Sequence, residues 1–391
     1  MKKILHITTD NKFISHALTT FENVYPGQNT VWMFANGHDG HVSKNHRDLE
    51  FTFFDTLKPS FLKKLKAFDL VVIHGFDLFK FPLVALAPAG VKFAWLGWGY
   101  DYYSYIYKNE DALLLSETLP LKKSCRKTSF ADFLHPVKLA KKVARKLTEL
   151  AFKNKALKRI GSFSPVLSEE HKLVANAGLI THLPALMPWN YGSLEESLVK
   201  NFIGERVNGD AILLGNSASF TNNHLEAFEL IQANEDVIGL HSKIVAPLSY
   251  GDACYKKAML EQGELNFGER FHPVVDFMAI DDYVALLKQC GFAIMNHKRQ
   301  QAVGNIVIML YLGARVFLRE ENPTYQMLKN DGAILNTIME LEQQPDLLKA
   351  PLTEQEIQTN IAILYKHWSK QAIDLKTKNL VSFHLDLGEH A

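Results

Sequence analysis

The sequence has few cysteines, and the three that it has lie far apart. Cys125, Cys254 and Cys290 stand among 391 residues, and none belongs to a C-x-x-C motif. Zinc knuckles need closely spaced cysteines and disulfide frameworks need an even number, so the sequence favours neither. We expect a protein of a reducing compartment.

Long apolar runs are also missing. No stretch approaches the roughly 18 apolar residues that identify a membrane-spanning helix. The first apolar run, "ILHI", ends at Thr8, Thr9 and Asp10, which makes it too short for the core of a signal peptide. We therefore expect a cytoplasmic protein that does not span the membrane.

Neither sign of charge is in excess over the whole chain. The 43 Lys and Arg and 42 Asp and Glu give a formal net charge of +1, which argues against nucleic acid as the main partner. Basic residues are nevertheless concentrated in residues 121–160, where thirteen Lys and Arg accompany only Asp132 and Glu149.

From Pro136 onward, this basic segment has the pattern of an amphipathic helix. An apolar stripe recurs at Leu139, Val143, Leu147 and Leu150, and basic residues occupy other faces. Basic amphipathic helices bind anionic membrane surfaces, which predicts a membrane contact here. A solvated helix that packs on its own domain is the alternative. The residues expected at the membrane are Lys138, Lys141, Lys142, Arg145 and Lys146.

Short apolar runs alternate with helical patterns along the chain, as in βαβ units with parallel sheets. We predict an α/β protein with two Rossmann-like doubly wound domains, residues 1–190 and 205–350. Helices in 351–391 are expected to pack back toward the first domain, and ligands are expected in a cleft at the carboxyl ends of the strands. The expected strands are 3–8, 30–35, 51–54, 70–74, 92–96, 159–163, 211–215, 243–247, 265–267, 292–296 and 315–318.

Two strand ends in the second half lead into turns of small and polar residues. After strand 211–215, Gly215 allows close backbone approach, and Asn216 and Ser217 supply polar groups beside helix amides. This predicts phosphate contact, with an ordinary N-capped turn as the alternative. Strand 243–247 ends at Pro247, and Tyr250 in the following turn can stack on a base or sugar or pack on its own turn.

The stretch "NHKRQQAVGN" follows strand 292–296 and precedes a long apolar helix. A helix that begins near Gly304 points its positive end at whatever binds there, and Arg299 adds a formal charge. This predicts a diphosphate site, and a solvated loop before a core helix is the alternative. The residues expected to contribute are Lys298, Arg299, Gln300, Gln301, Gly304 and Asn305.

Polar residues also follow strand 315–318. The carboxylate of Glu321 is suited to bind sugar or ribose hydroxyls, and Asn322 stands beside it. Alternatively, Asn322 and Pro323 simply begin the next helix, with proline in its first turn.

Polar strand ends in the first half suggest an acceptor side. Asp101 is the first candidate to remove a proton from an acceptor hydroxyl, with His74 and Asp10 behind it. The alternative is that the aromatic residues near Asp101 pack between domains and that His74 is a buried structural histidine. No D-x-D or H-E-x-x-H motif occurs, so we expect no metal. The neighbouring residues expected on the acceptor side are Gly75, Trp98 and Gly99.

Five sequence blocks follow one another over residues 213–323, namely "LLGNSASFTNNHLEA", "IVAPLSYGDACYKKAMLEQG", "DDYVALLKQCGFAI", "RQQAVGN" and "ENP". In order and spacing they resemble the bacterial TDP-N-acetylfucosamine:lipid II N-acetylfucosaminyltransferases of glycosyltransferase family 56. In the first half the resemblance is limited to Asp10, His74-Gly75 and Trp98-Gly-x-Asp101.

The resemblance implies a GT-B glycosyltransferase with two Rossmann-like domains that face each other across a cleft. It implies a nucleotide diphosphate sugar as donor and a lipid-linked saccharide as acceptor, in enterobacterial common antigen synthesis at the inner face of the inner membrane, without cofactor or metal. A nucleotide-sugar epimerase of the same fold and a non-catalytic nucleotide-sugar-binding subunit remain as alternatives, and retention or inversion stays open. The implied donor residues are Gly215, Asn216, Ser217, Arg299, Gln300, Gln301, Gly304, Asn305 and Glu321.

Overall fold

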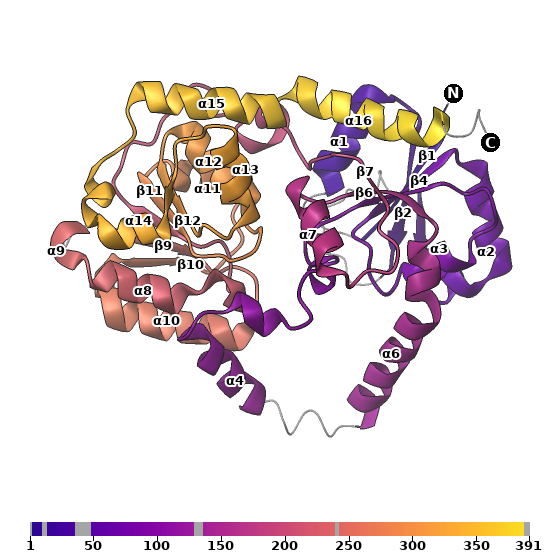
Figure 1. The fold of residues 1–391 in the computed structure, drawn as a ribbon, viewed down its shortest axis with the longest axis horizontal. Coiled ribbons are helices and arrows are strands. Elements are labelled where there is room, and N and C mark those ends of the chain that lie inside the picture. The colour runs from indigo at the N-terminus through magenta and orange to yellow at the C-terminus, as the bar shows by residue number, and fades with distance from the viewer. Residues whose placement is uncertain (1, 10–13, 36–47, 129–135, 239–241, 387–391) are drawn as a thin grey trace. The chain divides into compact units, whose positions relative to one another are not determined.

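The computed structural model describes residues 2–9, 14–35, 48–128, 136–238 and 242–386 (Figure 1). The chain forms two compact units, each with its own parallel sheet. Unit 1 consists of Met1–Lys108, Phe133–Ser193 and Trp368–Ala391, and unit 2 consists of Asn109–Asp132 and Leu194–His367.

Unit 1 has a parallel sheet of seven strands within the described residues, in the order β3-β2-β1-β4-β5-β6-β7. The central strands are buried along their whole length because helices cover both faces, which accounts for their continuous apolar runs. The strands are β1 (Ile4–Thr8), β2 (Asn29–Phe34), β3 (Leu49–Phe51), β4 (Leu70–His74), β5 (Phe93–Leu96), β6 (Ile160–Ser164) and β7 (Ala185–Leu186).

The core of unit 1 joins residues from both ends of the chain. Leu380 and Val381 of α16 are buried in one cluster with Ile4 of β1, Phe21 of α1 and Leu70 of β4. Of the C-terminal helices expected to pack toward the first domain, α16 lies in unit 1, whereas residues 351–367 belong to unit 2. The helices are α1 (Ile14–Val24), α2 (Pro59–Lys63), α3 (Phe81–Leu86), α6 (Pro136–Leu157), α7 (Glu169–Ala177) and α16 (Lys370–Asp386).

Unit 2 has a parallel sheet of six strands in the part of the chain that the structure describes, in the order β10-β9-β8-β11-β12-β13. Its core gathers Ile212, Phe228, Tyr255 and Phe317 from four elements. The strands are β8 (Ile212–Leu214), β9 (Ile244–Pro247), β10 (Phe271–Val274), β11 (Phe292–Met295), β12 (Arg315–Leu318) and β13 (Asn336–Thr337).

The helices of unit 2 include one from the first half of the sequence, α4. They are α4 (Thr118–Thr128), α8 (His224–Gln232), α9 (Glu235–Ile238), α10 (Ala253–Phe267), α11 (Ile280–Leu287), α12 (Val303–Leu312), α13 (Pro323–Asn330), α14 (Ile338–Gln343) and α15 (Glu354–Trp368). Short 3-10 turns span Asp55–Leu57, Lys64–Ala67, Tyr103–Tyr105, Glu110–Leu113, Phe220–Asn222, Gly268–Arg270 and Pro345–Lys349, and a π turn spans Leu194–Leu198.

The strand order reverses once in each sheet, as in doubly wound folds. In unit 2 the reversal lies between β8 and β11, and in unit 1 between β1 and β4. Ligands of such sheets bind outside the carboxyl ends of the strands at this point. Gly215 follows β8 and Asn296 follows β11, so the predicted donor turns meet there.

Two predicted strands are wrong. The strand expected at 51–54 ends at Phe51, because β3 spans Leu49–Phe51 and a turn follows it. Residues 265–267 form the last turn of helix α10, and the strand of this region is β10 at Phe271–Val274. The run "LNF" is too short for its apolar pattern to separate a helix from a strand. Helix α10 packs closely on β10 at Gly263, where an added Cβ would lie 2.3 Å from the Phe271 ring.

The expectation of no disulfide is also wrong, because Cys125 of α4 is bonded to Cys254 of α10. Residues 109–132, which the sequence placed in the first domain, belong to unit 2. We call the described residues 109–126 the strap. Two hydrogen bonds also join the strap to α8 and its N-cap: Thr118 Oγ1 donates to Glu226 Oε2 (2.7 Å), and Leu115 N donates to Asn223 Oδ1 (3.0 Å). The two cysteines are 129 residues apart in the sequence, so no local sequence pattern predicts that they form a disulfide.

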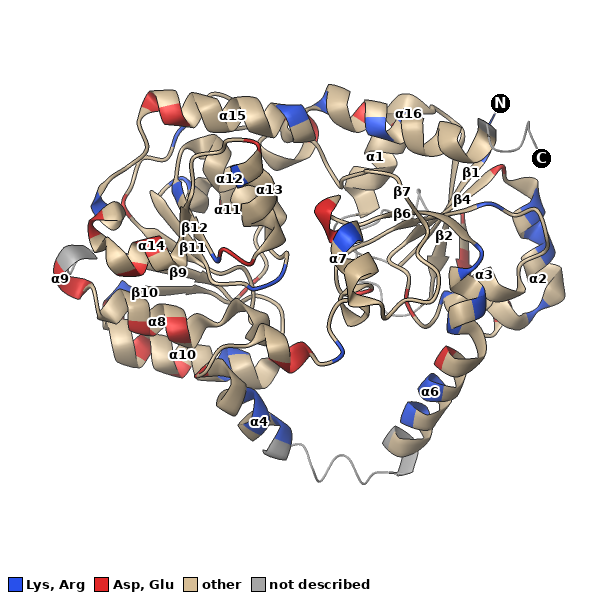
Figure 2. Cartoon of the chain, in the orientation of Figure 1, with Lys and Arg blue, Asp and Glu red and all other residues tan. Residues whose placement is uncertain are grey.

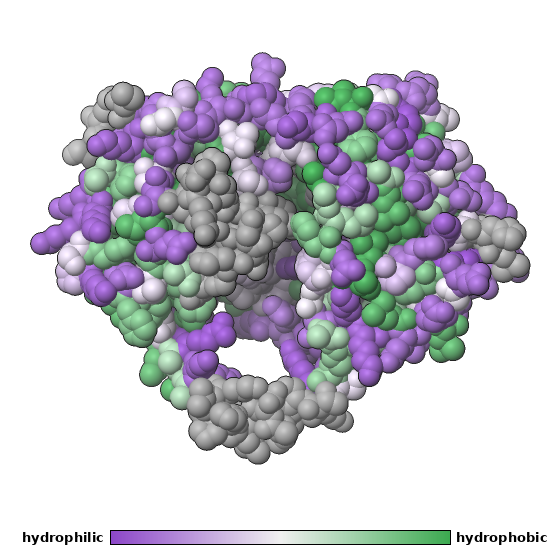
Figure 3. Space-filling view, turned by 180° about the vertical axis from the view of Figure 1, so that it is seen from behind, coloured by the Kyte–Doolittle hydropathy of each residue, from purple (hydrophilic) through white to green (hydrophobic). Residues whose placement is uncertain are grey.

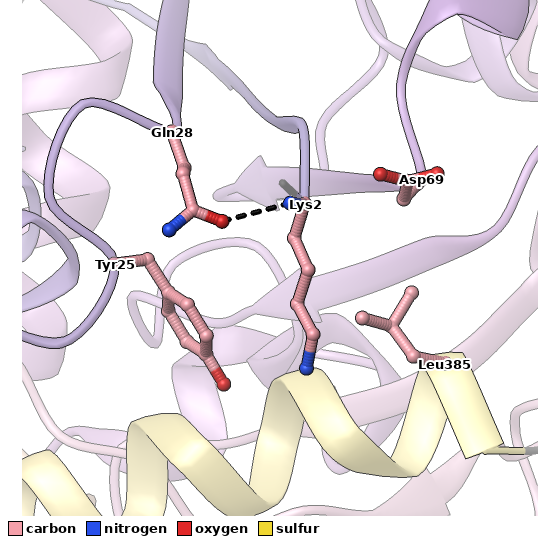
Figure 4. A pocket seen from close by; sticks show the side chains of 5 residues that line it. All are labelled: Lys2, Tyr25, Gln28, Asp69 and Leu385. Atoms are coloured by element: carbon pink, nitrogen blue, oxygen red, sulfur yellow. Dashed lines mark hydrogen bonds between the residues drawn. The ribbon is translucent and has the colours of Figure 1, made fainter.

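A pocket of about 530 Å³ lies at the amino ends of the unit 1 strands, opposite to their carboxyl ends (Figure 4). Lys2 precedes β1, Gln28 precedes β2 and Asp69 precedes β4, and Lys2 N donates to Gln28 Oε1 (2.8 Å). Because ligands of parallel sheets bind at the carboxyl ends, this pocket is not the expected ligand site. Within the described residues, no helix has the length and apolar character needed to cross a membrane.

Candidate functional site

The turn after β8 is built for close backbone approach. Gly215 has a left-handed φ of 65°, and an added Cβ would lie 2.7 Å from both Asn222 Oδ1 and His224 Nε2. A side chain at this position would therefore disrupt the turn as well as strain its backbone.

Asn222, which the sequence analysis did not single out, organises this turn. Its buried Oδ1 accepts from Asn216 N (2.9 Å), and its Nδ2 donates to the Ser217 (2.9 Å) and Ser219 (3.1 Å) carbonyls. Because Nδ2 is used in this way, Oδ1 must also accept from His297 Nε2 (2.7 Å). Burial lowers the pKa of His297 to about 3, so this histidine is neutral.

Gln301 joins the predicted donor residues of three turns. Its Nε2 donates to Asn216 Oδ1 (2.9 Å), and its Oε1 accepts from Arg299 Nε (3.2 Å) and Thr221 Oγ1 (2.7 Å). Asn216 Nδ2 in turn donates to the Tyr250 hydroxyl (3.0 Å). The structure thus brings Asn216, Tyr250, Arg299 and Gln301 into one hydrogen-bonded group, with Ser217 Oγ 3.5 Å from Gln301 Nε2.

Helix α12 begins directly behind this group. Ala302 precedes it with a left-handed φ of 59°, a conformation that costs a non-glycine residue about 1–3 kcal/mol and often marks functional sites. The first turn of α12 carries no acidic residue, so its positive end is not neutralised locally. A Cβ added to Gly304 would meet only Leu198, at 3.7 Å, so packing does not require this glycine.

The other predicted donor residues have different roles in the structure. Asn322 is buried at the start of α13, where its Nδ2 donates to the His297 and Arg299 carbonyls (3.0 and 2.9 Å) and so holds the turn. Asn305 Nδ2 donates to the Tyr283 hydroxyl (2.8 Å). Pro247, Gln300 and Gln301 are buried, and Lys298 Nζ lies 3.4 Å from two strap carbonyls, those of Ala112 and Leu114.

Glu321 remains accessible at the end of β12, with 45% of its side chain exposed. Arg319, a residue that the sequence analysis missed, donates from Nε to Glu321 Oε1 (2.7 Å) and from Nη1 to Asn296 Oδ1 (3.2 Å). The apolar run of β12 ends one residue before Arg319, a signal that could have drawn attention to it.

In unit 1, Asp101 connects the turns after β4 and β5. Its Oδ2 accepts from Phe76 N (2.8 Å) and Trp95 Nε1 (2.7 Å), and its Oδ1 accepts from Trp98 N (2.8 Å). Burial raises the pKa of Asp101, although the three hydrogen bonds act in the opposite direction. The carboxylate therefore holds this corner of the unit.

The predicted acceptor-side residues pack around the same corner. Gly75 (φ 64°) and Gly99 (φ 95°) have left-handed backbones, and a Cβ on Gly75 would lie 3.1 Å from the Trp98 ring and 3.0 Å from the Tyr100 hydroxyl. Asp77 follows directly and accepts from the fully buried Lys80 Nζ (2.8 Å). The sequence analysis missed this buried ion pair.

His74 lies in a buried chain of hydrogen bonds whose direction can be deduced. Asn29 Nδ2 donates to Glu22 Oε2 (2.7 Å), so Asn29 Oδ1 must accept from His6 Nε2 (3.2 Å). Neutral His6 then accepts at Nδ1 from His74 Nε2 (2.9 Å), and His74 accepts at Nδ1 from the Tyr191 hydroxyl (2.9 Å). Burial lowers the pKa of both histidines. Asp10 lies outside the described residues.

Helix α6 presents its apolar stripe to solvent. Leu139, Val143, Leu147 and Leu150 are 51–69% exposed, and Lys141, Lys142, Arg145 and Lys146 are exposed on the same helix. Blue residues recur along α6 in Figure 2, and Figure 3 shows hydrophobic and hydrophilic residues side by side on the surface seen from behind. The side chain of Lys138 lies outside the described part.

Three potential metal ligands lie together in the described residues: Cys125, Asp252 and Cys254. Two of them are bonded to each other, and Asp252 accepts from Tyr255 N (3.0 Å) as the N-cap of α10. The group has a structural explanation without a metal.

Residues 185–358 match the family described as 4-alpha-L-fucosyltransferase glycosyl transferase group 56. The second half of the chain is thus similar to this family. The protein is a glycosyltransferase, as the sequence resemblance predicted, and the matched range contains all the predicted donor turns of unit 2.

Solved structures similar to this glycosyltransferase cover both units. HepE of Anabaena, in complex with UDP and glucose, has a TM-score of 0.63 at 13% identity, over 98% of this chain and 100% of that chain. The lipopolysaccharide outer core galactosyltransferase WaaB has a TM-score of 0.57 at 10% identity, over 97% and 99%. A UDP-N-acetylglucosamine 2-epimerase has a TM-score of 0.51 at 12% identity, over 100% and 98%. These likenesses show the fold, and the predicted GT-B fold is confirmed.

Proposed function

We propose that this family 56 glycosyltransferase transfers an amino-deoxy sugar such as N-acetylfucosamine from a TDP-linked donor to a lipid-linked saccharide, as in enterobacterial common antigen synthesis. The observation that carries the donor part is the hydrogen-bonded group of Asn216, Tyr250, Arg299 and Gln301 in front of helix α12. A diphosphate needs a cation and backbone amides, and here Arg299 supplies the cation and the first turn of α12 supplies the amides.

In this proposal the diphosphate lies between the Gly215 turn and the start of α12. The Arg299 guanidinium and the α12 amides stabilise the negative charge that develops on the departing diphosphate, so no metal is needed for that step. Tyr250, which is 47% exposed, is available to stack on the base. Glu321 accepts a hydrogen bond from a hydroxyl of the donor.

The acceptor part of the proposal depends on α6. Its exposed leucines and lysines match an anionic leaflet, with apolar side chains entering the interface and cations meeting the headgroups. We infer that the protein is peripheral on the cytoplasmic face of the inner membrane, where a lipid-linked acceptor is accessible to it.

The base is proposed among Asp101, His74 and Asp10, as the strand ends of unit 1 suggested. The raised pKa of Asp101 makes its carboxylate more basic, although three donors already occupy it. His74 is buried, so it would act through Tyr191, to which it is hydrogen bonded.

Calorimetric titration with TDP-, UDP- and GDP-sugars, followed by a transfer assay on a lipid-linked saccharide, tests this function. Arg299→Ala should weaken donor binding roughly 10- to 100-fold, because a charged hydrogen bond contributes about 1.5–3 kcal/mol. Lys257→Ala, on an exposed face of α10, is the matched control and should bind normally.

Different outcomes reject different parts. If no nucleotide binds, or if Arg299→Ala binds as well as the parent protein, the donor site is wrong. Conversion of the donor without any acceptor would indicate an epimerase. A chain that binds donor normally and transfers nothing in any assay would indicate a non-catalytic subunit.

A further inference from the structure

Arg319 occupies a position next to the donor turns that the proposed function does not use. It follows β12, which pairs in parallel with β11, so it lies at the same carboxyl edge as Arg299 and Gln301. Its side chain is 25% exposed and donates to Glu321 and Asn296.

The partner Asn296 is itself fixed in orientation. Its Nδ2 donates to the Asn223 carbonyl (3.0 Å), and Asn223 Nδ2 donates back to the Asn296 carbonyl (3.1 Å), with both asparagines buried. The Asn296 oxygen therefore faces Arg319 and must be the acceptor. This pair ties the turn after β8 to the end of β11.

A guanidinium held at two points is a rigid support. Nε binds Glu321 Oε1 and Nη1 binds Asn296 Oδ1, so the planar group cannot rotate without losing one contact. Glu321 is thereby held through one oxygen. The carboxylate also accepts a hydrogen bond from the Glu321 backbone N–H, and among the described residues no other side chain donates to it.

We propose that Arg319 is a positioning residue that holds the Glu321 carboxylate so that its second oxygen accepts a hydrogen bond from a carbohydrate hydroxyl of the donor. This rests on the proposed donor site. The hydroxyl belongs either to the pentose of the nucleotide or to the transferred sugar, and the chemistry of recognition is the same for both. Arg319 then determines whether the site distinguishes a nucleotide sugar from a bare diphosphate.

The ionisation of Glu321 agrees with this role. Burial opposes ionisation, but the hydrogen bond and charge of Arg319, together with the charge of Lys298, keep the pKa of Glu321 below its ordinary value. At neutral pH Glu321 is therefore an acceptor only, as hydroxyl recognition requires.

Another role for Arg319 would be direct contact with the diphosphate, as a second cation beside Arg299. The two roles differ in one respect that can be measured, because inorganic pyrophosphate carries charge but no carbohydrate hydroxyl. If Arg319 contacts the phosphates, its replacement should weaken the binding of pyrophosphate and of nucleotides alike. If Arg319 instead positions Glu321, its replacement should weaken the binding only of ligands that carry a carbohydrate hydroxyl.

The experiment is calorimetric titration of the full chain with pyrophosphate, dTDP and dTDP-glucose. Arg319→Gln and Glu321→Gln should each weaken dTDP-glucose roughly 10- to 100-fold and leave pyrophosphate within about twofold. Loss already seen with dTDP assigns the hydroxyl to the pentose, and loss seen only with dTDP-glucose assigns it to the sugar. Arg319→Gln/Glu321→Gln should be no weaker than Glu321→Gln alone, because the two residues act as one unit.

Three results would overturn the inference: equal weakening of pyrophosphate and dTDP-glucose, no effect of Arg319→Gln, or additive effects in the double variant. Arg319→Lys keeps the charge but cannot hold two acceptors in one plane, so it should resemble Arg319→Gln. Thermal unfolding confirms that each variant is folded. If the parent protein binds none of the three ligands, the donor site itself is rejected and the Arg319 role with it. If the parent protein binds these ligands but the Arg319 variants do not show the expected affinities, only the Arg319 role is rejected and the proposed donor site is not.

Discussion

Gln301 Nε2 donates a 2.9 Å hydrogen bond to Asn216 Oδ1, and this contact links the turn after β11 to the turn after β8. The two strands are neighbours in the sheet, at the point where the strand order reverses. Gln301 also accepts from Arg299, so one amide sets the position of the cation relative to the Gly215 turn. The proposed donor site depends on this geometry.

Replacement of Gln301 tests that dependence. Gln301→Ala removes the contacts to Asn216 and Arg299 and should weaken nucleotide-sugar binding roughly tenfold or more. The hydrogen bond to Asn216 is neutral and contributes about 0.5–1.5 kcal/mol, and the hydrogen bond from the charged Arg299 contributes about 1.5–3 kcal/mol. Calorimetric titration measures the effect. Gln262→Ala, on an exposed face of α10, is the matched control. Equal binding by the two variants would show that the Gln301 amide does not organise the site.

The sequence allowed the grouping of the proposed donor residues to be predicted, because they follow strands with clear apolar runs. Asn216, Tyr250, Arg299 and Gln301 each stand a few residues after such a run, and parallel strands bring their carboxyl ends to one edge. The resemblance to family 56 added the expected ligand, and the family match over 185–358 agrees with the resemblance itself.

The supporting residues could not be predicted in the same way. The contact between Asn222 and His297 joins positions 75 residues apart, and no local pattern reports it. The last residues of the strap begin the basic segment 121–160, yet Cys125 joins the strap to Cys254 in unit 2. Long-range pairs of this kind are set by tertiary packing, which single-sequence periodicity does not contain.

Asp101 should matter for stability as well as for transfer. In Asp101→Asn one amide nitrogen replaces a carboxylate oxygen, so it faces at least one of the donors Phe76 N, Trp95 Nε1 and Trp98 N without an acceptor. A buried donor left without a partner costs about 1–3 kcal/mol, which should lower the melting temperature of unit 1. Donor titration should be unchanged, because the donor turns belong to unit 2.

The same variant separates two roles of Asp101. A purely structural role predicts that transfer recovers when the assay temperature is lowered well below the melting temperature. A role as base predicts a loss of roughly 100-fold or more in kcat at any temperature. Unchanged stability together with unchanged transfer would contradict both roles.

Buried histidines should make the protein sensitive to mild acid. Burial lowers the pKa of His6 and His224 from 6.5 to about 4 and that of His297 to about 3. The unfolded chain therefore binds more protons than the folded chain between pH 6.5 and about 4, so the free energy of unfolding falls as the pH decreases through this window. Each such histidine contributes on the order of 3 kcal/mol of this loss.

Melting temperatures measured between pH 7.5 and 4 check this expectation. The variant His297→Gln keeps a side chain that can donate to Asn222 but cannot titrate, so its melting temperature should depend less steeply on pH than that of the parent protein. His272, which is exposed on β10, offers the control His272→Gln, whose pH dependence should match the parent. A flat profile in the parent protein would refute the assignment of neutral buried histidines.

The disulfide between Cys125 and Cys254 should stabilise unit 2. It closes a loop with a sequence separation of 129 residues, and such closure typically contributes about 2–4 kcal/mol by restricting the unfolded chain. Reduction with dithiothreitol should therefore lower the melting temperature and release the strap. Cys254→Ser should melt at the temperature of the reduced parent and show no further change with dithiothreitol. Equal melting of all forms would mean that the bond contributes nothing to stability.

Helix α6 should bind anionic membranes through its leucines and lysines together. Leu147→Ser combined with Leu150→Ser removes apolar surface that is 60% and 69% exposed, and should weaken binding to phosphatidylglycerol-rich vesicles roughly 10- to 100-fold in a flotation assay. Leu265→Ser is the matched control, because Leu265 is 77% exposed on α10.

The contribution of charge is tested by Lys141→Glu with Arg145→Glu, which should weaken binding to anionic vesicles and leave the weak binding to phosphatidylcholine unchanged. If Leu265→Ser reduced flotation as much as the α6 pair, the binding surface would lie elsewhere. If none of these variants altered flotation, α6 would have no part in membrane contact, and the lipid-linked acceptor would have to be recognised without it.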